Sequence, residues 1–383
     1  MLASFSTCDS IMDNRETLSV PAQTRRLGIL APLKSWGGIE RKMLILCREF
    51  LSMGIQPVLL RTRGGQIPYP DEFPQEVDVV DLDSRGKLDA IPRLIRYLRR
   101  DRLDALLTAK DHAAKVAVLA VNVGRIDTPV FVKVTNTLSM TLRRPLKRRF
   151  AKWLYPRADR IIAISQGVKQ DLVEQFGMPP GKIEVIYNPM VTPDFEERAR
   201  RCPEHSWLGP EQPPVFLGAG RLSGQKDFVT LVEAFAQVRS RIPCRLIILG
   251  EGEQRPLIEA RALQLNVRDD VDLPGYVSDP LPWMAAADAF VLSSRYEGLG
   301  NVLVEAMAVG TTLVSTDCPS GPSEILEGGR LGRLSPVGDP RRLAEGMLQA
   351  VEHPIDPNVL RAGAARFESN AIARRYLNLM GLL

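Results

Sequence analysis

The sequence predicts an α/β protein in which two doubly wound Rossmann-like domains face each other across a cleft. Its 383 residues are too many for one ordinary hydrophobic core and suit two domains of roughly 150–190 residues each. Short apolar runs alternate with amphipathic segments along the chain, which is typical of parallel sheets covered by helices. The alternation is interrupted once, by a proline-rich stretch at 188–214, which we interpret as the connection between the domains.

The first half of the chain contains the elements of one such domain. Apolar runs predict strands at 26–31, 57–61, 77–82, 105–108, 129–134, 160–164 and 182–186. Helical patterns fall between them, at 39–51, 87–100, 113–123, 145–155 and 166–176. We expect this first domain to cover 25–190, after a loose extension at 1–24.

The same rhythm resumes after the connection. Strands are expected at 215–219, 245–249, 271–273, 289–293, 312–315 and 332–334, again with helices between them. These elements predict a linker at 191–214, a second domain at 215–365, and a C-terminal helix within 366–383 that crosses back to the first domain. Ligands of such sheets bind beyond the carboxyl ends of the strands, so two facing domains predict one deep cleft.

The composition is that of an ordinary globular protein. Apolar residues make up 45% and charged residues 25% of the chain, which excludes disorder, collagen-like repeats and coiled coil for the whole chain. The net charge of +5 is mild, so a basic surface must come from local clustering. The five cysteines are scattered, and no apolar run approaches the ~18–20 residues of a membrane-spanning helix. We therefore expect a cytoplasmic protein.

The most informative segment reads SSRYEGLGNVLVEA and follows the fourth strand of the second domain. Glu297 lies in its glycine-rich loop, and an apolar helix is expected to begin near Asn301. Glu305 interrupts that helix, and a buried carboxylate needs a partner. The partner is either an arginine or lysine in a structural ion pair or the hydroxyls of a ribose, because glycines and a helix N-terminus suit a phosphate beside it.

Two further segments follow the first strand of each domain. GAGRLSGQKD contains Gly220, Arg221 and Lys226, and its two cations would either neutralise a diphosphate or lie on a solvated turn. KSWGGIER contains Gly37 and Gly38, whose backbone N–H groups would either approach an anion or form a tight turn. Both segments point into the expected cleft.

Taken in order, these segments resemble a known family. The motifs are Gly37-Gly-Ile-Glu-Arg41, Gly220-Arg-Leu with Lys226, Leu249-Gly-Glu-Gly252, Gly275-Tyr-Val and Glu297-x7-Glu305. Over residues 26–350 the chain resembles the retaining glycosyltransferases of family 4, also called the group 1 transferases. The resemblance implies the GT-B fold and transfer of a hexose from a nucleotide-sugar with retention at the anomeric carbon. No metal ion or other cofactor is implied.

The resemblance also implies roles for individual residues. Arg221 and Lys226 would hold the donor pyrophosphate, Glu305 the ribose hydroxyls, and Glu297 the hydroxyls of the donor sugar. The remaining donor-binding residues would be Gly37, Gly38, Gly220, Gly298, Leu299, Gly300 and Asn301.

A histidine that many members carry in the first domain has no obvious equivalent here. The corresponding segment reads VKVTN, which offers Thr135 or Asn136. His112, in the segment after the preceding strand, either faces the cleft as a catalytic residue or only begins a helix. The resemblance therefore leaves the first-domain catalytic residue open among these three.

A basic segment at 143–155 interleaves six cations with apolar and aromatic residues. As an amphipathic helix it would suit an anionic membrane surface, or it would form a solvated basic face over the core. No nucleic-acid motif accompanies it. Two Asp-x-Asp matches, at 81–83 and 270–272, lack the surrounding pattern of a metal site.

These features together predict a retaining glycosyltransferase that associates peripherally with the membrane and builds a bacterial-type cell-surface polysaccharide. A hexose or N-acetylhexosamine would move from a nucleotide-sugar, for which the family resemblance implies UDP as the carrier, to a glycan or a polyprenyl- or lipid-linked acceptor. One alternative is a nucleotide-sugar epimerase of the same architecture. Another is a catalytically degenerate transferase that acts as a binding subunit.

Overall fold

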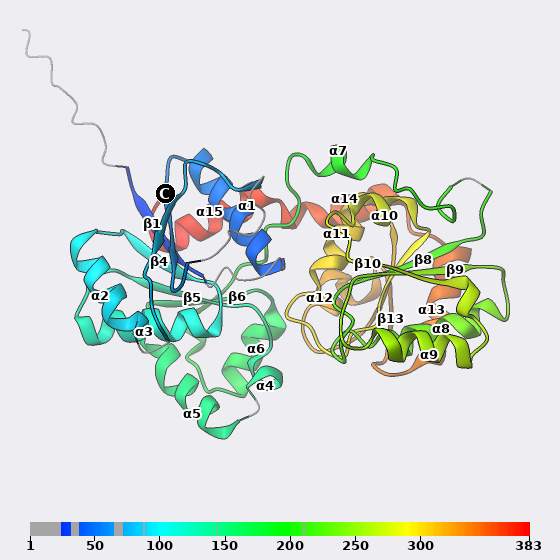
Figure 1. Ribbon diagram of the computed structural model, residues 1–383, viewed down its shortest axis with the longest axis horizontal. Helices are drawn as coiled ribbons and strands as arrows, with labels where there is room; N and C mark the ends of the chain where they lie inside the picture. The colour runs from blue at the N-terminus through cyan, green and yellow to red at the C-terminus, as the bar shows by residue number, and fades with distance from the viewer. Residues whose placement is uncertain (1–23, 32–37, 65–71, 87–88, 143, 210) are drawn as a thin grey trace, which may run out of the picture.

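The computed structural model describes residues 24–31, 38–64, 72–86, 89–142, 144–209 and 211–383. It contains two parallel sheets, each flanked by helices, that lie side by side in Figure 1. This is the predicted fold class, and the prediction is confirmed.

The first sheet has seven parallel strands in the order β3-β2-β1-β4-β5-β6-β7. Their bounds are β1 Arg26–Leu30, β2 Gln56–Arg61, β3 Asp78–Asp81, β4 Ala105–Thr108, β5 Val130–Val134, β6 Arg160–Ala163 and β7 Ile183–Val185. The helices between them are α1 Gly38–Ser52, α2 Ala90–Arg100, α3 Asp111–Gly124, α4 Leu138–Thr141, α5 Pro145–Leu154 and α6 Gln166–Glu174. Because helices cover both faces, the central strands are buried almost completely.

The second sheet has six strands in the order β10-β9-β8-β11-β12-β13. Their bounds are β8 Val215–Ala219, β9 Arg245–Leu249, β10 Val271–Gly275, β11 Ala289–Leu292, β12 Thr312–Thr316 and β13 Arg333–Ser335. The helices are α8 Phe228–Arg239, α9 Arg255–Gln264, α10 Leu281–Ala286, α11 Asn301–Val309, α12 Pro322–Ile325, α13 Pro340–Glu352 and α14 Pro357–Ala364.

Strand order places the site in both domains. The order reverses between β1 and β4 in the first sheet and between β8 and β11 in the second. A reversal leaves a crevice at the carboxyl ends of the strands, because the loops on its two sides turn to opposite faces. The glycine-rich segments follow β1, β8 and β11 and therefore begin at these crevices.

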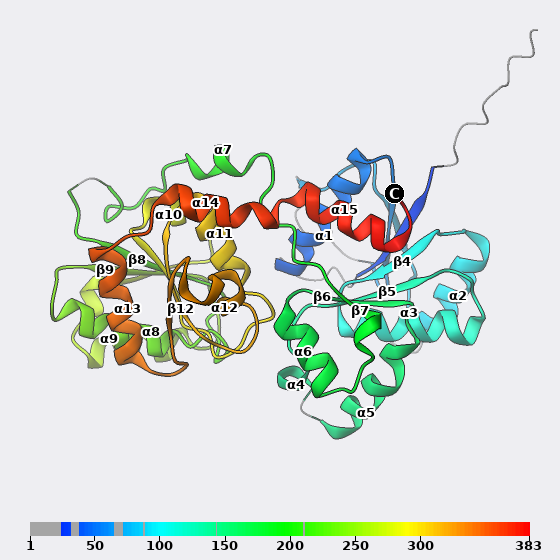
Figure 2. The same cartoon turned by 180° about the vertical axis from the view of Figure 1, so that it is seen from behind.

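The chain crosses between the domains twice, and the two crossings lie side by side. Met190 and Val191 donate backbone hydrogen bonds to the carbonyl of Phe367, and Ser369 donates one back to Val191. Beyond this point α15, Ser369–Met380, packs on α1 of the first domain, as Figure 2 shows in red. Its Tyr376 is fully buried there.

The connection between the domains is more ordered than its composition suggests. A short helix, α7 (Phe195–Ala199), forms within it. Arg198 of α7 makes two hydrogen bonds with Asp279, at 3.0 and 2.8 Å, and an ion pair with Asp194 at 3.6 Å. A bidentate pair to another segment holds a short helix that its own sequence could not. Within the described residues, none of the helices is both long enough and apolar enough to cross a bilayer.

Candidate functional site

A cavity of about 470 Å³ opens between the carboxyl ends of the two sheets. Most of the residues singled out from the sequence line it, namely Gly38, Thr135, Asn136, Gly220, Arg221, Lys226, Glu297, Gly298, Leu299, Gly300, Asn301 and Glu305. Gly37 lies outside the described residues. The cavity therefore brings together residues of both domains, from Gly38 of the first to Glu305 of the second.

Glu297 is the most firmly held carboxylate of the site. Its side chain accepts hydrogen bonds from Lys226 Nζ at 2.7 Å and from the hydroxyl of Ser294 at 2.7 Å, both to Oε1. The residue is only 7% exposed. Two donors on one oxygen fix the carboxylate, and Oε2 has no hydrogen bond to the residues that the structure describes. Glu297 can thus present one oxygen to a ligand hydroxyl without moving.

The loop between β11 and α11 ends in a conformation that requires glycine. Gly300 has a φ of +90° at the N-terminus of α11, a region that other residues enter only with strain. After this turn α11 begins at the cavity, which Gly300, Asn301 and Val302 line. A helix N-terminus with free N–H groups favours an anion.

The first domain holds the backbone of the same loop. Thr137 donates its hydroxyl to the carbonyl of Glu297 at 3.0 Å, and Ser165 donates to the carbonyl of Gly298 at 2.7 Å. A Cβ atom on Gly298 would lie only 2.4 Å from the carbonyl oxygen of Thr135. Only glycine therefore permits this approach of the two domains.

Glu305 already has a partner, and it comes from the other domain. Lys42 of α1 donates a hydrogen bond to Glu305 Oε1 at 3.2 Å, with the two side chains 7% and 17% exposed. Burial lowers the pKa of Lys42, and the Glu305 carboxylate opposes that shift. The structural ion pair that the sequence left open is thus present, and the same carboxylate lines the cavity.

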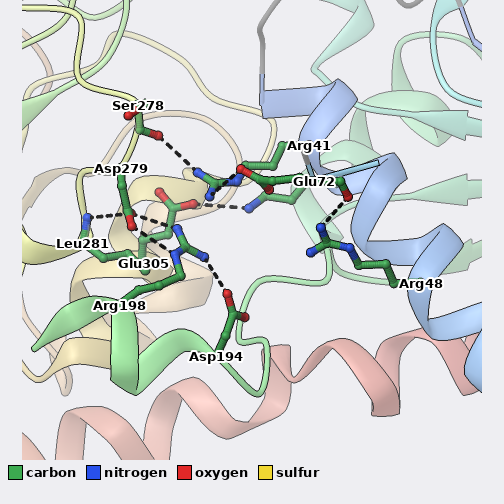
Figure 3. Close-up of polar contacts among 10 residues, drawn as sticks. Arg41, Arg48, Glu72, Asp194, Arg198, Ser278, Asp279, Leu281 and Glu305 are labelled. Carbon is green, nitrogen blue, oxygen red and sulfur yellow. Dashed lines mark hydrogen bonds and ion pairs between the residues drawn. The ribbon is translucent and has the colours of Figure 1, made fainter. Parts of the chain in front are cut away.

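Figure 3 shows the polar contacts behind this pair. Arg41, next to Lys42 in α1, donates to the carbonyl of Ser278 at 3.4 Å, and Arg198 binds the neighbouring Asp279. The loop after β10 is thereby tied both to the first domain and to α7. A change in the position of α1 would therefore alter the contacts of both Glu305 and this loop.

Among the cavity-lining residues to which the sequence assigned no role, three bear on the chemistry of the site. They are Lys42, Lys133 and Tyr276. Burial and the positive charge of Lys42 lower the pKa of Lys133 to about 7. Tyr276 is 57% exposed despite its size, so its ring is available to a ligand. The motif Gly275-Tyr-Val could have pointed to Tyr276, but a lysine inside an apolar strand carries no such signal.

His112 differs from the other candidate residues in its position. It lies in the first turn of α3, is partly buried, and is not among the described residues that line the cavity. Thr135 and Asn136 do line it. Of the three candidates for the first-domain catalytic residue, the geometry thus favours the two that follow β5.

The acidic pairs that resemble metal-binding motifs have other partners. Asp81 makes two hydrogen bonds of 2.7 Å with Arg61. Asp270 pairs with Arg239 at 2.7 Å, and Asp272 contacts the His205 ring at 3.0 Å. Among the residues that the structure describes, no group of three His, Cys, Asp or Glu side chains is placed to hold a metal ion.

Comparison with known proteins agrees with this architecture. Residues 36–192 match the family model "Glycosyltransferase Family 4", and residues 213–353 match "Glycosyl transferases group 1". The structure of Anabaena Alr3699/HepE in complex with UDP superimposes with a TM-score of 0.77 at 20% identity, over 94% of this chain and 100% of that one. The fold is that of the GT-B glycosyltransferases. The chain belongs to glycosyltransferase family 4, the group 1 transferases.

Two curated relatives are named as sugar transferases, one for a diphospho-undecaprenol-linked acceptor and one for lipopolysaccharide. One is the N-acetylgalactosamine-N,N'-diacetylbacillosaminyl-diphospho-undecaprenol 4-alpha-N-acetylgalactosaminyltransferase of Campylobacter jejuni, 31% identical over 59% of this chain and 61% of that protein. The other is the lipopolysaccharide 1,6-galactosyltransferase of Escherichia coli K12, 30% identical over 48% and 49%. The matches span about half to three-fifths of the length of these relatives.

Proposed function

We propose that this protein is a retaining glycosyltransferase that moves a hexose or N-acetylhexosamine from a UDP-sugar to a glycan or lipid-linked oligosaccharide of a cell-surface polysaccharide. The observation that carries the proposal is the meeting of Arg221, the Lys226–Glu297 pair and the N-terminus of α11 at one cavity. This set offers positive charge for a diphosphate beside a fixed carboxylate for a sugar.

The main chemical demand of such a transfer is the departure of the nucleoside diphosphate. As the bond between the anomeric carbon and the diphosphate oxygen breaks, negative charge grows on that oxygen. Arg221, Lys226 and the N–H groups of α11 would stabilise it, and preorganised groups of this kind are the most effective. Arg221 is exposed in the cavity, so its guanidinium is free to bind two phosphate oxygens.

The carboxylates would fix the rest of the donor. Glu297 would accept hydrogen bonds from the sugar hydroxyls through Oε2, while Lys226 and Ser294 hold its other oxygen. Glu305 would accept from the ribose hydroxyls beside Lys42. The exposed ring of Tyr276, on the loop after β10, would lie against the base.

In a retaining transfer the acceptor oxygen bonds to the anomeric carbon on the face that the diphosphate leaves. The proton of the acceptor hydroxyl then passes to the departing diphosphate oxygen, which balances the step without a protein base. Thr135 and Asn136 border the cavity from the first domain and would position the acceptor hydroxyl. The contacts of Thr137 and Ser165 with the loop of the second domain would keep water from the donor.

The acceptor is proposed to be lipid-linked because of the surface of α5. Leu146 and Trp153 are 80% and 49% exposed there, and Phe150 is 37% exposed. The exposed cations on and beside α5 are Arg144, Lys147, Arg149, Lys152 and Arg157. Apolar side chains ringed by cations suit the headgroup region of an anionic membrane, which would bring such an acceptor to the cleft.

Binding of UDP, GDP and ADP and of their sugars, measured by thermal shift with EDTA present, tests the donor site. A ligand at 100 times its Kd adds about 2.7 kcal/mol to the free energy of unfolding. Stabilisation by one nucleotide family supports the proposal, and its loss in Lys226→Ala but not in Lys169→Ala places the ligand at this cavity. Stabilisation by none of them contradicts it.

Turnover with the donor so identified tests the reaction. Lipid-linked oligosaccharides are offered as acceptors, and nucleoside diphosphate release and the anomeric coupling of the product are measured. An axial donor that gives an axial product supports retention, and an equatorial product contradicts it. Glu297→Gln should lower kcat about 100-fold or more while the protein stays folded, because the hydrogen bonds to the sugar strengthen in the transition state.

A further inference from the structure

Lys133 is a charged residue in a position where strands of this kind carry apolar ones. It lies in β5, whose five residues are all buried, and is 2% exposed. Its Nζ atom is 5.3 Å from the centre of the Tyr376 ring of α15. The residue also lines the cavity at the end of the strand.

The ammonium of Lys133 has no anionic partner among the described residues. No hydrogen bond or ion pair joins its Nζ to any of them, whereas the nearby Lys42 is paired with Glu305 at 3.2 Å. A buried ammonium without a carboxylate is costly, and a methionine would fill the same space at less cost. Such a group in a cleft is a candidate for binding a ligand.

The cavity as a whole carries more positive than negative side chains. Five cations line it, namely Arg41, Lys42, Lys133, Arg221 and Lys226, against three carboxylates, Glu251, Glu297 and Glu305. Two of these carboxylates are bonded to Lys226 and Lys42, and Glu251 is paired at 2.7 Å with Arg255. Arg41 is paired with Glu72 at 3.6 Å, so the excess positive charge lies on Lys133 and Arg221.

We propose that Lys133 binds the diphosphate of the nucleotide-sugar from the first domain, opposite Arg221 and Lys226 of the second. The inference rests on the proposed function and names a further residue of that site. A phosphate of a diphospholipid acceptor shares this chemistry. We favour the diphosphate of the donor because Lys133 lies near Lys42, and Lys42 is paired with Glu305 of α11. In the proposed function, the N-terminus of α11 binds the phosphates of the donor.

The proposal has a second, separate consequence. Burial and the charge of Lys42 lower the pKa of Lys133 to about 7, so at pH 8 about nine-tenths of the molecules carry it neutral. A diphosphate next to it would favour the charged form, and binding would then draw in up to about one proton. The groups next to Lys133 are Lys42 of α1 and Tyr376 of α15. Glu297 and Glu305 of the second domain line the same cavity, and each is bonded to another lysine.

Isothermal titration at pH 8 tests both consequences. UDP, UMP and uridine are titrated into the wild type, Lys133→Met and the control Lys169→Met on α6, in two buffers of different ionisation enthalpy; GDP and ADP series are run in parallel. In Lys133→Met we expect UDP to bind about 10–100-fold more weakly, uridine to bind within two-fold of wild type, and proton uptake to disappear. Lys169→Met should match the wild type. An unliganded melting temperature at or above that of wild type shows that the variant is folded.

The outcomes separate the two proposals. A wild type that binds none of UDP, GDP and ADP overturns the proposed function and this inference with it. Equal weakening of UDP and uridine, or UDP binding as in wild type, overturns the inference alone. Unchanged UDP binding with a raised KM for a diphospholipid acceptor assigns Lys133 to the acceptor phosphate and likewise overturns the donor assignment.

Discussion

Lys42 and Glu305 are joined across the two domains by a hydrogen-bonded ion pair of 3.2 Å, although 263 positions separate them in the sequence. Both side chains are largely buried, so water screens the pair little. The carboxylate that would bind the ribose therefore also fastens α11 to α1. Ligand binding and domain contact thus depend on one side chain.

We expect the pair to be energetically coupled. Lys42→Met, Glu305→Gln and the double variant are unfolded in urea without ligand. Removal of one partner leaves the other charge buried, so the two single changes together should cost about 1–3 kcal/mol more than the double change. Additive effects within about 0.5 kcal/mol would contradict a pair that holds the domains.

Gly298→Ala should separate the domains without unfolding either. The added Cβ would meet the carbonyl oxygen of Thr135 at 2.4 Å and Asn136 Cα at 3.0 Å, and backbone atoms cannot rotate away. We expect turnover to fall about 10-fold or more and the radius of gyration from small-angle scattering to rise. Gly181→Ala is the control, because a Cβ there has no neighbour within 4 Å. A Gly298→Ala protein as compact and active as wild type would show that the described approach is not needed.

The stability of the protein should respond to pH through Lys133. Its pKa is about 7 in the folded protein against an ordinary 10.5, so between these values the unfolded chain holds a proton that the folded one lacks. Stability relative to Lys133→Met should then rise with pH from 7 upward, by at most about 1.4 kcal/mol per pH unit. Below pH 7 both states are protonated and the difference should level off. Urea midpoints of both proteins from pH 6 to 9.5 measure this, and parallel curves would refute it.

Binding to membranes should depend on α5. We expect the wild type to sediment with vesicles containing anionic phosphatidylglycerol, and much less with purely zwitterionic ones. Leu146→Ser with Trp153→Ser should weaken sedimentation because it removes the exposed apolar contacts, and Leu257→Ser on α9 is the exposed control. Equal sedimentation of all three proteins would remove α5 as the contact surface.

Much of the fold could be predicted because its signals are local. The strands are short apolar runs bounded by turns. The ends of each predicted strand lie within two residues of the ends of the observed strand. Strand boundaries are commonly misplaced by about 2–4 residues when they are predicted from sequence. The helix α7 could not be predicted, since the bidentate contact of Arg198 with Asp279 that supports it comes from a distant segment.

The candidate site likewise contains residues that a sequence pattern can predict and residues that it cannot. Glu297, Arg221 and Lys226 belong to glycine-rich loops, and such loops stand out in a sequence. The partner of Glu305 could not be predicted from a pattern, because nothing in the sequence of α1 distinguishes Lys42 from the neighbouring cations Arg41 and Arg48. Lys133 is hidden for a different reason. It occupies one position of an otherwise apolar strand, and only the packing of α15 shows that its charge is buried.

The packing of α15 on α1 also bears on how the chain is made. Synthesis delivers the strands of the first sheet first, yet the apolar face of α1 is completed only by Ile372, Tyr376 and Leu377. At 5–20 residues per second, about 10–40 s pass between the end of β7 and the arrival of this helix. During that interval the apolar face of α1 is exposed on the nascent first domain. Chaperone binding at this stage, rather than the stability of the folded protein, would then limit the yield of folded protein.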